Sequence, residues 1–312
     1  MLYLSKRHDP IKNEILLSKW IPSNQTAAEL AEETHKLFHE KLKTFKPLAK
    51  HKMKPDRNLK YGFPRLLLTT KRQPDHKNPP GYFIENGHLF PEWKKQLDKE
   101  YKNLNQKIIE HVNVLDYGAI GDGMTDNTKA FEAALDKGKR MVYIPEGIYI
   151  IKGIKLPSYT CLIGEGKEKT ILKLADTSPK KATLVTNANH ILGNHHILVQ
   201  GMTLDWNTER LPKDVLSSAG NNRSSCLTYA HVTYGWVKDV TARNAGLHGF
   251  DVSAAYYTYF GDGTRSRFQS SYIWLDHLNG YGFGDDGVTT HHSRHILITN
   301  SHMCDPSGRA HK

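Results

Sequence analysis

The chain has 312 residues, a formal net charge of +11 and a mean hydropathy of −0.58. Hydrophobic residues make up 38% of it, which is low for a compact α/β enzyme and fits an elongated protein with much exposed surface. No run of 18 apolar residues occurs, and the first residues lack the apolar core of a signal peptide. The sequence therefore predicts neither a membrane-spanning helix nor a cleavable leader.

The positive charge belongs mainly to the front of the chain. Up to His111 there are 22 Lys and Arg against 13 Asp and Glu, giving +9, and from Val112 onward there are 21 against 19, giving +2. A basic N-terminal segment of this kind could bind nucleic acid, an anionic wall polymer or an acidic partner. No nucleic-acid-binding motif accompanies it, so we expect no nucleic-acid partner. The three cysteines, Cys161, Cys226 and Cys304, have neither metal-ligand nor disulfide-framework spacing, and we expect buried thiols.

The N-terminal part is predicted to be partly helical. Residues 1–22 are interpreted as a loosely structured arm. Thr26 and Glu29 have capping-box spacing, and apolar residues then recur every three or four positions to Phe45, which predicts an amphipathic helix. Residues 46–91 are rich in Lys, Pro, His and Asn and are expected to be irregular, with one strand at residues 66–70 and a turn at 79–81.

A second helix is predicted from about Pro91 to about Glu110, with the proline in its first turn. An apolar stripe close to heptad spacing runs along it. The stripe must pack on something, and two interpretations stay open: copies of itself in an oligomer, or the chain's own following domain. Its residues are Trp93, Leu97, Tyr101 or Glu100, Leu104 and Ile108.

Residues 112–173 have a different sequence pattern, in which glycine-rich turns alternate with short apolar runs. Asp126 or Thr128 could cap a short helix that ends near Gly138. Two runs of four apolar, mostly β-branched residues follow at 141–144 and 148–151, separated by a Pro-Glu-Gly turn, and predict short strands.

After Lys173 short strands recur without helices. The segments 194–205, 234–244 and 292–302 read as repeats, in which Met202-Thr203, Val240-Thr241 and Ile298-Thr299 are expected to coincide. Shorter runs begin at Cys226, Gly249 and Gly287, and residues 255–271 read as a protruding loop. Strand runs every 20–25 residues predict a solenoid of stacked coils, specifically a parallel β-helix. The chain ends in mid-coil under this repeat, and we expect it to be incomplete there.

Three ordered motifs carry a family resemblance: Y-G-A-I-G-D-G-M-T-D-N-T at 117–128, I-P-E-G-I-Y at 144–149 and L-I-G-E-G at 162–166. They resemble the start of the pectate-lyase-like superfamily domain of β-helix enzymes and of phage tailspike and appendage proteins. The resemblance implies a mainly β fold, a right-handed single-stranded parallel β-helix at 112–312. A basic, largely helical region at 1–111 would precede it and serve attachment and oligomerisation.

Adjacent carboxylates make residues 275–295 the richest candidate site. Asp285 and Asp286 are flanked by Gly284 and Gly287, which favour a bulge or turn at which both side chains reach the surface. Close carboxylates raise one another's proton affinity, so that one can act as an acid and the other as a base. The alternative is a turn pair that caps backbone amides or holds a cation.

The pair also resembles the Gly-Asp-Asp motif of polygalacturonase-type β-helix glycosidases, which implies inverting hydrolysis with a histidine one coil later. His311 occupies the comparable place, although no glycine follows it. One coil earlier the family has an aspartate where this chain has His248 before Gly249. That departure leaves two possibilities, a histidine base or a different polymer. The candidate catalytic residues are therefore Asp285, Asp286, His248 and His311.

Further residues are candidates for substrate contacts, because aromatic rings suit sugar stacking and polar side chains can line a groove. The histidine-rich segment does not predict a metal site, since neighbouring positions on a strand point different ways. No cofactor is expected, although a calcium-like divalent cation stays possible. The candidate substrate-binding residues are Asp251, His291, His292, Trp274, Tyr281 and Arg309.

The resemblance to appendage and tailspike proteins implies a phage or prophage protein that binds and hydrolyses a wall glycan such as teichoic acid. We expect a homotrimer that joins other virion proteins through its N-terminal region, with cytoplasmic synthesis followed by a place in the virion or outside the cell. Two alternatives stay open: a non-catalytic glycan-binding spike, and a secreted pectic lyase or polygalacturonase.

Overall fold

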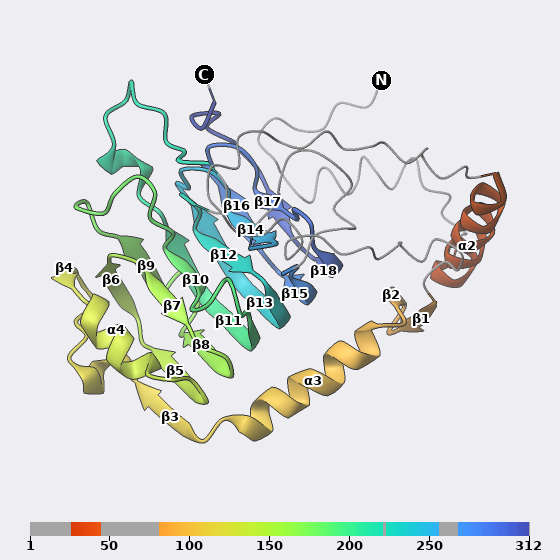
Figure 1. The fold of residues 1–312 in the computed structure, drawn as a ribbon, viewed down its shortest axis with the longest axis horizontal. Helices are drawn as coiled ribbons and strands as arrows, with labels where there is room; N and C mark the ends of the chain where they lie inside the picture. The colour runs from red at the N-terminus through yellow and green to blue at the C-terminus, as the bar shows by residue number, and fades with distance from the viewer. Residues whose placement is uncertain (1–25, 45–80, 221–222, 256–267, 312) are drawn as a thin grey trace. The chain divides into compact units, whose positions relative to one another are not determined.

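The computed structural model describes residues 26–44, 81–220, 223–255 and 268–311 (Figure 1). These residues fall into two units, one that extends to Gln96 and one that starts at Leu97. The expected arm at 1–22, the strand at 66–70 and most of the loop at 255–271 lie outside the described residues. Within the described residues, no helix is long and apolar enough to cross a membrane.

The first unit contains one helix and one hairpin. Helix α2 (Ala27–Thr44) begins with the predicted capping box, since Glu29 N donates to Thr26 Oγ1 at 3.2 Å and Thr26 N donates to a Glu29 carboxylate oxygen at 2.7 Å. Strands β1 (Tyr82–Glu85) and β2 (His88–Pro91) are antiparallel. Their turn places Asn86 at φ 52° and Gly87 at φ 79°, the left-handed values that a two-residue Asn-Gly hairpin needs. The expectation that Pro91 begins a helix is wrong, because Pro91 ends β2.

Helix α3 (Lys94–Lys107) is shorter than predicted, and its residues from Leu97 on belong to the second unit. Leu97 and Leu104 are fully buried, and the ring of Tyr101 meets that of Trp236 edge-on at 5.2 Å. This part of the stripe therefore packs on the chain's own β-sheet, which is one of the two interpretations that the sequence left open.

The second unit is mainly β, and its strands pair in parallel from one coil to the next. A twelve-stranded sheet follows the main order β18-β15-β13-β11-β8-β5-β3, and a five-stranded sheet follows β17-β14-β12-β10-β7 (Figure 1). The main strands of the larger sheet are β3 (Glu110–Asn113), β5 (Arg140–Ile144), β8 (Thr160–Gly164), β11 (Asn194–Asp205), β13 (Val232–Arg243), β15 (Ser271–Asp276) and β18 (Arg294–Thr299).

The smaller sheet and the remaining strands complete the coils. The smaller sheet consists of β7 (Ile154–Leu156), β10 (Val185–Asn187), β12 (Leu227–Ala230), β14 (Phe250–Ser253) and β17 (Val288–Thr289). The strands that branch from the main order of the larger sheet are β4 (Asp122–Asp126), β6 (Gly147–Ile151), β9 (Thr170–Leu174), β16 (Asn279–Tyr281) and β19 (His302–Met303).

The predicted short helix is α4 (Thr128–Leu135), preceded by the 3-10 turn η2 (Val114–Tyr117). Asp126 Oδ1 accepts from Thr128 N at 3.0 Å, and the apolar side chains at helical spacing, Phe131 and Leu135 among them, are buried. Gly138 follows the helix rather than capping it, since Asp136 is the C-cap. A second 3-10 turn, η3 (Thr208–Arg210), follows β11.

The solenoid repeat is confirmed for two of the three aligned segments. Met202 pairs with Val240 and Thr203 with Thr241, as expected. Ile298 pairs instead with Leu275, which pairs with Val237. The third alignment was therefore wrong by three residues, since Ile298 falls in the column of Val237 and not in that of Val240.

The interior is a continuous apolar column, as stacked coils require. In-register residues of five neighbouring strands of the larger sheet are all fully buried, so each coil covers the apolar face of the next. Cys161 and Cys226 are buried and Cys304 is partly buried, all as free thiols. The buried column consists of Val142, Leu162, Val199, Val237 and Leu275.

One corner of the coils carries a second column, made of aromatic rings. Five residues lie in the left-handed region, each one position before the in-register residues of β8, β11, β13, β15 and β18. Successive ring centroids are 4.8, 5.1, 5.3 and 4.4 Å apart, which is contact distance for aromatic pairs. We call Tyr159, His196, Tyr234, Tyr272 and His295 the corner column.

Candidate functional site

The predicted Asp-Asp segment lies in the loop between β16 and β17 and is fastened to the coil before it. Asp285 N donates to Leu247 O at 2.9 Å, and Gly249 N donates to Asp286 O at 3.0 Å. These backbone bonds continue the coil-to-coil ladder outside the regular strands. They hold the segment that contains His248 directly beside the two aspartates.

Glycine makes this close approach possible. A Cβ atom at Gly284 would overlap the carbonyl oxygen of Gly246 and lie 3.0 Å from Ala310 Cβ. A Cβ atom at Gly249 would lie 2.7 Å from Gly287 O. Gly284, which precedes the aspartates, and Gly249, which follows His248, are therefore needed where the backbones of neighbouring coils meet.

The four candidate catalytic residues come together, and we call them the carboxylate site. His311 Nε2 lies 3.0 Å from Asp285 Oδ2, a hydrogen bond, and His248 Nδ1 lies 3.8 Å from Asp286 Oδ2. His248, Asp285 and Asp286 each offer one ligand atom, and these three atoms lie within 4.8 Å of one another. The side chain of His248 is 5% exposed, whereas that of Asp286 is 52% exposed, so the site opens to solvent on the aspartate side.

Burial and neighbouring charges shift the pKa values of two groups in the carboxylate site, His248 and Asp286. Burial lowers the pKa of His248 to about 4, with Asp285 opposing the shift and His291 and His311 adding to it. Burial raises the pKa of Asp286, and the neighbouring charge of Asp285 raises it further. A neutral imidazole thus faces an aspartate that holds its proton to a higher pH than usual.

Asp251 is fully buried on β14 and lies in register with Thr289 of β17. Burial raises the pKa of Asp251 to about 7, although the nearby Ser253 hydroxyl lowers it in part. Neither carboxylate oxygen of Asp251 makes a hydrogen bond of ordinary geometry within the described residues. A role for it in substrate binding stays a prediction.

The other predicted substrate-binding residues divide by position. His291 stands near the carboxylate site, with its ring 6.4 Å from that of His248, and His292 follows it in the left-handed region. Trp274 lies on the larger sheet, where its Nε1 donates to Thr299 Oγ1 at 2.8 Å and Lys238 covers its ring.

Tyr281 and Arg309 have surroundings of their own. Tyr281 ends β16, is 39% exposed and pairs in register with Arg243. Arg309 donates to the carbonyl oxygens of Thr208, Leu211 and Pro212, so its guanidinium fastens one loop. The structure therefore places one of the six, His291, in ring contact with the carboxylate site, and substrate binding by the others stays a prediction.

A parallel β-solenoid with carboxylates and imidazoles gathered on its surface loops defines the class of protein: a β-helix protein with a candidate polar site. The chain belongs to the pectate-lyase-like family described as rhamnogalacturonase A/epimerase, whose model matches residues 111–303.

Several similar proteins are phage or phage-related proteins. The chain is 47% identical over 215 residues to a putative phage-related protein, YobO, of Bacillus subtilis, covering 69% of this chain and 26% of that protein. It is 40% identical over 198 residues to the pre-neck appendage protein of Bacillus phage phi29, covering 62% of this chain and 23% of that protein. The chain thus spans about a quarter of the length of these relatives.

A solved structure supports the same relationship. The N-terminal fragment of gene product 12 of bacteriophage phi29 superposes with a TM-score of 0.59 at 36% identity. The superposition covers 69% of this chain and 35% of that one.

Proposed function

We propose that this protein is a phage or prophage appendage that binds and hydrolyses a bacterial wall glycan such as teichoic acid. Its similarity to pre-neck appendage proteins supports a place in the virion. The hydrolytic part of the proposal rests on one observation, the convergence of His248, Asp285, Asp286 and His311 at a solvent-accessible point of the solenoid.

The environment of each group supports a division of labour. The raised pKa of Asp286 favours this carboxyl, of the two, as the group that donates a proton to a leaving oxygen, as a general acid does. Asp285, oriented by its hydrogen bond with His311, is then the base that activates water. His248 stays neutral and presents an unpartnered Nδ1 to the pair.

The test uses purified bacterial wall glycans and pectic glycans, with products identified by mass spectrometry. We expect a product that gains the mass of water, whereas a new double bond would indicate a lyase. Asp285→Asn and Asp286→Asn should each lower the rate by about 10²- to 10⁴-fold, the usual contribution of general acid–base catalysis. Asp116→Asn, an exposed aspartate in η2, is the matched control. Equal rates in all three variants would refute the assignment.

A divalent cation is a second proposal for the same residues. It is favoured by the three ligand atoms within 4.8 Å and by the buried, unpartnered Nδ1 of His248. Two carboxylates with one imidazole suit a cation such as manganese better than calcium, which prefers oxygen ligands alone. Isothermal titration of the protein with each ion measures this directly, and heat release that is unchanged in Asp286→Asn would exclude it.

Three finer features belong to the same proposal. The coils are proposed to wind right-handedly, the assembly to be a homotrimer, and residues 1–111 to attach it to other virion proteins. The relatives that are virion appendages support attachment. Sedimentation velocity tests the trimer, with a persistent monomer at micromolar concentration as the opposing result, and an experimental structure tests the handedness.

A further inference from the structure

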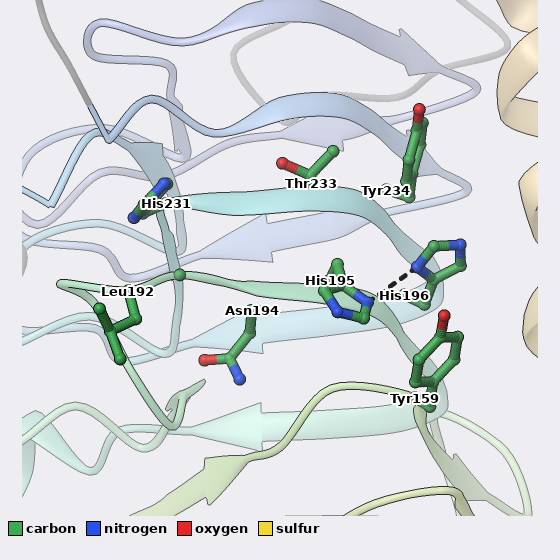
Figure 2. A pocket seen from close by; sticks show the side chains of 9 residues that line it. Tyr159, Leu192, Asn194, His195, His196, His231, Thr233 and Tyr234 are labelled. Atoms are coloured by element: carbon green, nitrogen blue, oxygen red, sulfur yellow. Dashed lines mark hydrogen bonds between the residues drawn. The ribbon is translucent and has the colours of Figure 1, made fainter.

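A pocket of about 370 Å³ lies on the solenoid apart from the carboxylate site (Figure 2). It is framed by the start of β11, the start of β13 and the turns before β8 and β11, and shares no residue with the carboxylate site. Its volume falls within the range of small-ligand pockets, about 300–1,000 Å³. We call it the imidazole pocket, and its principal side chains are Tyr159, Leu192, His195, His231, Thr233 and Tyr234.

A relay of side chains stands behind this pocket. Glu100 of α3 receives a hydrogen bond from His196 Nε2 at 2.9 Å. His196 Nδ1 in turn lies 3.0 Å from His195 Nδ1, as the dashed line in Figure 2 shows. The side chains of Glu100 and His196 are 15% and 6% exposed, so the inner part of the relay is largely shielded from water.

The relay fixes which atom His195 presents to a ligand. With both rings neutral, His196 donates to Glu100 and must accept from His195 Nδ1–H, which leaves a lone pair on His195 Nε2. If His196 gains a proton, the middle bond reverses and His195 Nε2 carries the hydrogen. In either state Nε2 has no hydrogen-bond partner among the described residues.

A hydroxyl group satisfies both states, because it donates and accepts. A cation could use Nε2 only in the first state, which offers a lone pair, and an anion only in the second state, which offers a donor. The Nδ1 atoms of His195 and His196 cannot supply either, since they are engaged with each other. Burial and the neighbouring His196 also lower the pKa of His195, which weakens any attraction to an anion.

The remaining lining has the same character. The hydroxyls of Tyr159, Thr233 and Tyr234 make no hydrogen bond within the described residues, and Leu192 on the rim is 82% exposed. Apart from the histidines, the lining contains no acidic or basic side chain. Uncommitted hydroxyls beside apolar carbon complement a sugar ring, which has polar edges and a C–H face.

We propose that the imidazole pocket binds a neutral sugar residue, with His195 Nε2 as its central hydrogen-bonding group. The inference rests on the proposed function in one respect, that the sugar belongs to the same wall glycan. Binding there would hold the polymer at a second point on the solenoid. The carboxylate site would then act on a chain that is already attached.

The experiment is an NMR titration of the full chain with neutral methyl glycosides, and with glucuronate and inorganic phosphate as charged probes. We expect neutral glycosides to shift the ring signals of His195. His195→Ala should weaken binding about three- to tenfold, the effect of losing one hydrogen bond. His111→Ala, which removes an exposed histidine of β3, should not change it.

The double variant Asp285→Asn with Asp286→Asn separates this inference from the proposed function. We expect it to bind glycosides as the parent does while releasing no product. Binding in the absence of any hydrolysis by the parent would sustain the pocket and refute the hydrolase. Shifts caused by phosphate or glucuronate alone, or equal affinity of His195→Ala and parent, would overturn the pocket assignment.

Discussion

The carboxylate site and the imidazole pocket lie on one solenoid but depend on opposite kinds of residue at their unusual backbone positions, glycines at the first and bulky aromatic residues at the second. At the carboxylate site, coils approach so closely that position 284 has no room for a Cβ atom. At the pocket, bulky residues such as Tyr159, His196 and Tyr234 adopt left-handed backbone angles so that their rings stack. The glycines bring charged side chains together, whereas the aromatic residues form an uncharged surface. Substitutions can disrupt each arrangement separately.

The largest combined effect, on stability and on the carboxylate site together, is expected at Gly284. Gly284→Ala would force its methyl group onto the carbonyl oxygen of Gly246, which neighbouring backbone bonds hold in place. Overpacking of this kind costs about 1–3 kcal/mol or more, and the carboxylate site should be displaced with it. Gly220→Ala is the control, because nothing lies within 4 Å of the new atom and only its φ of 70° is unfavourable, at about 1 kcal/mol.

Chemical denaturation of both glycine variants measures the difference. If Gly284→Ala lost no more stability than Gly220→Ala, the close approach of the coils at this point would be wrong. The NMR signals of His195 should change little in either variant, because the imidazole pocket shares no residue with the carboxylate site.

This contrast explains how much the sequence could predict. The sequence predicts the residues of the carboxylate site, because adjacent aspartates flanked by glycines indicate both a turn and a pair of titratable groups. His248 and His311 were placed beside the aspartates by family resemblance, and their contacts agree with that placement. The distances could not be predicted, since they depend on coil stacking between segments far apart in sequence.

The imidazole pocket was not predicted, and the reason is physical. Histidine adopts left-handed angles more often than most residues but tyrosine does not, so Tyr159, His196 and Tyr234 together give no sequence signal for a corner. Glu100 lies 96 positions from His196, and only the fold reveals their contact. The hairpin of β1 and β2 is predictable from the sequence, because Asn86-Gly87 between apolar runs is a strong hairpin signal.

The second prediction concerns Asp251, a buried carboxyl whose ionisation should affect stability. The pKa of Asp251 is about 7 when folded, above its ordinary value near 4, so the folded state binds the proton more tightly than the unfolded state. Its contribution to stability is therefore fully present below about pH 4 and is lost as pH rises to about 7. At about 1.4 kcal/mol per pKa unit, the loss is at most on the order of 4 kcal/mol.

Asp251→Asn removes this ionisation while keeping the shape of the side chain. The stability difference between parent and variant should change between pH 4 and pH 8 in favour of the variant, because only the parent then buries a charge. Urea denaturation at both pH values measures it. A difference that stays constant with pH would show that Asp251 is not held in a desolvating environment.

The smallest effect is expected at Glu100, which anchors the relay of the imidazole pocket. Its pKa is lowered, first by the side-chain amide of Asn103 and then by His196. A lowered carboxyl pKa contributes stability above the usual range of glutamate, and that contribution is lost as pH falls through the folded pKa. Glu100→Gln should therefore cost about 1 kcal/mol at pH 7 and less at pH 4.

Stability alone would not separate a packing role from a role in the relay. Glutamine can donate as well as accept, so Glu100→Gln should release the fixed tautomer of His196 and, through it, that of His195. Ring ¹⁵N shifts of His195 report this, and they should move in Glu100→Gln while staying unchanged in the exposed control Glu132→Gln. Unchanged His195 shifts in Glu100→Gln would mean that α3 only packs on the sheet and that the pocket sets its own hydrogen bonding.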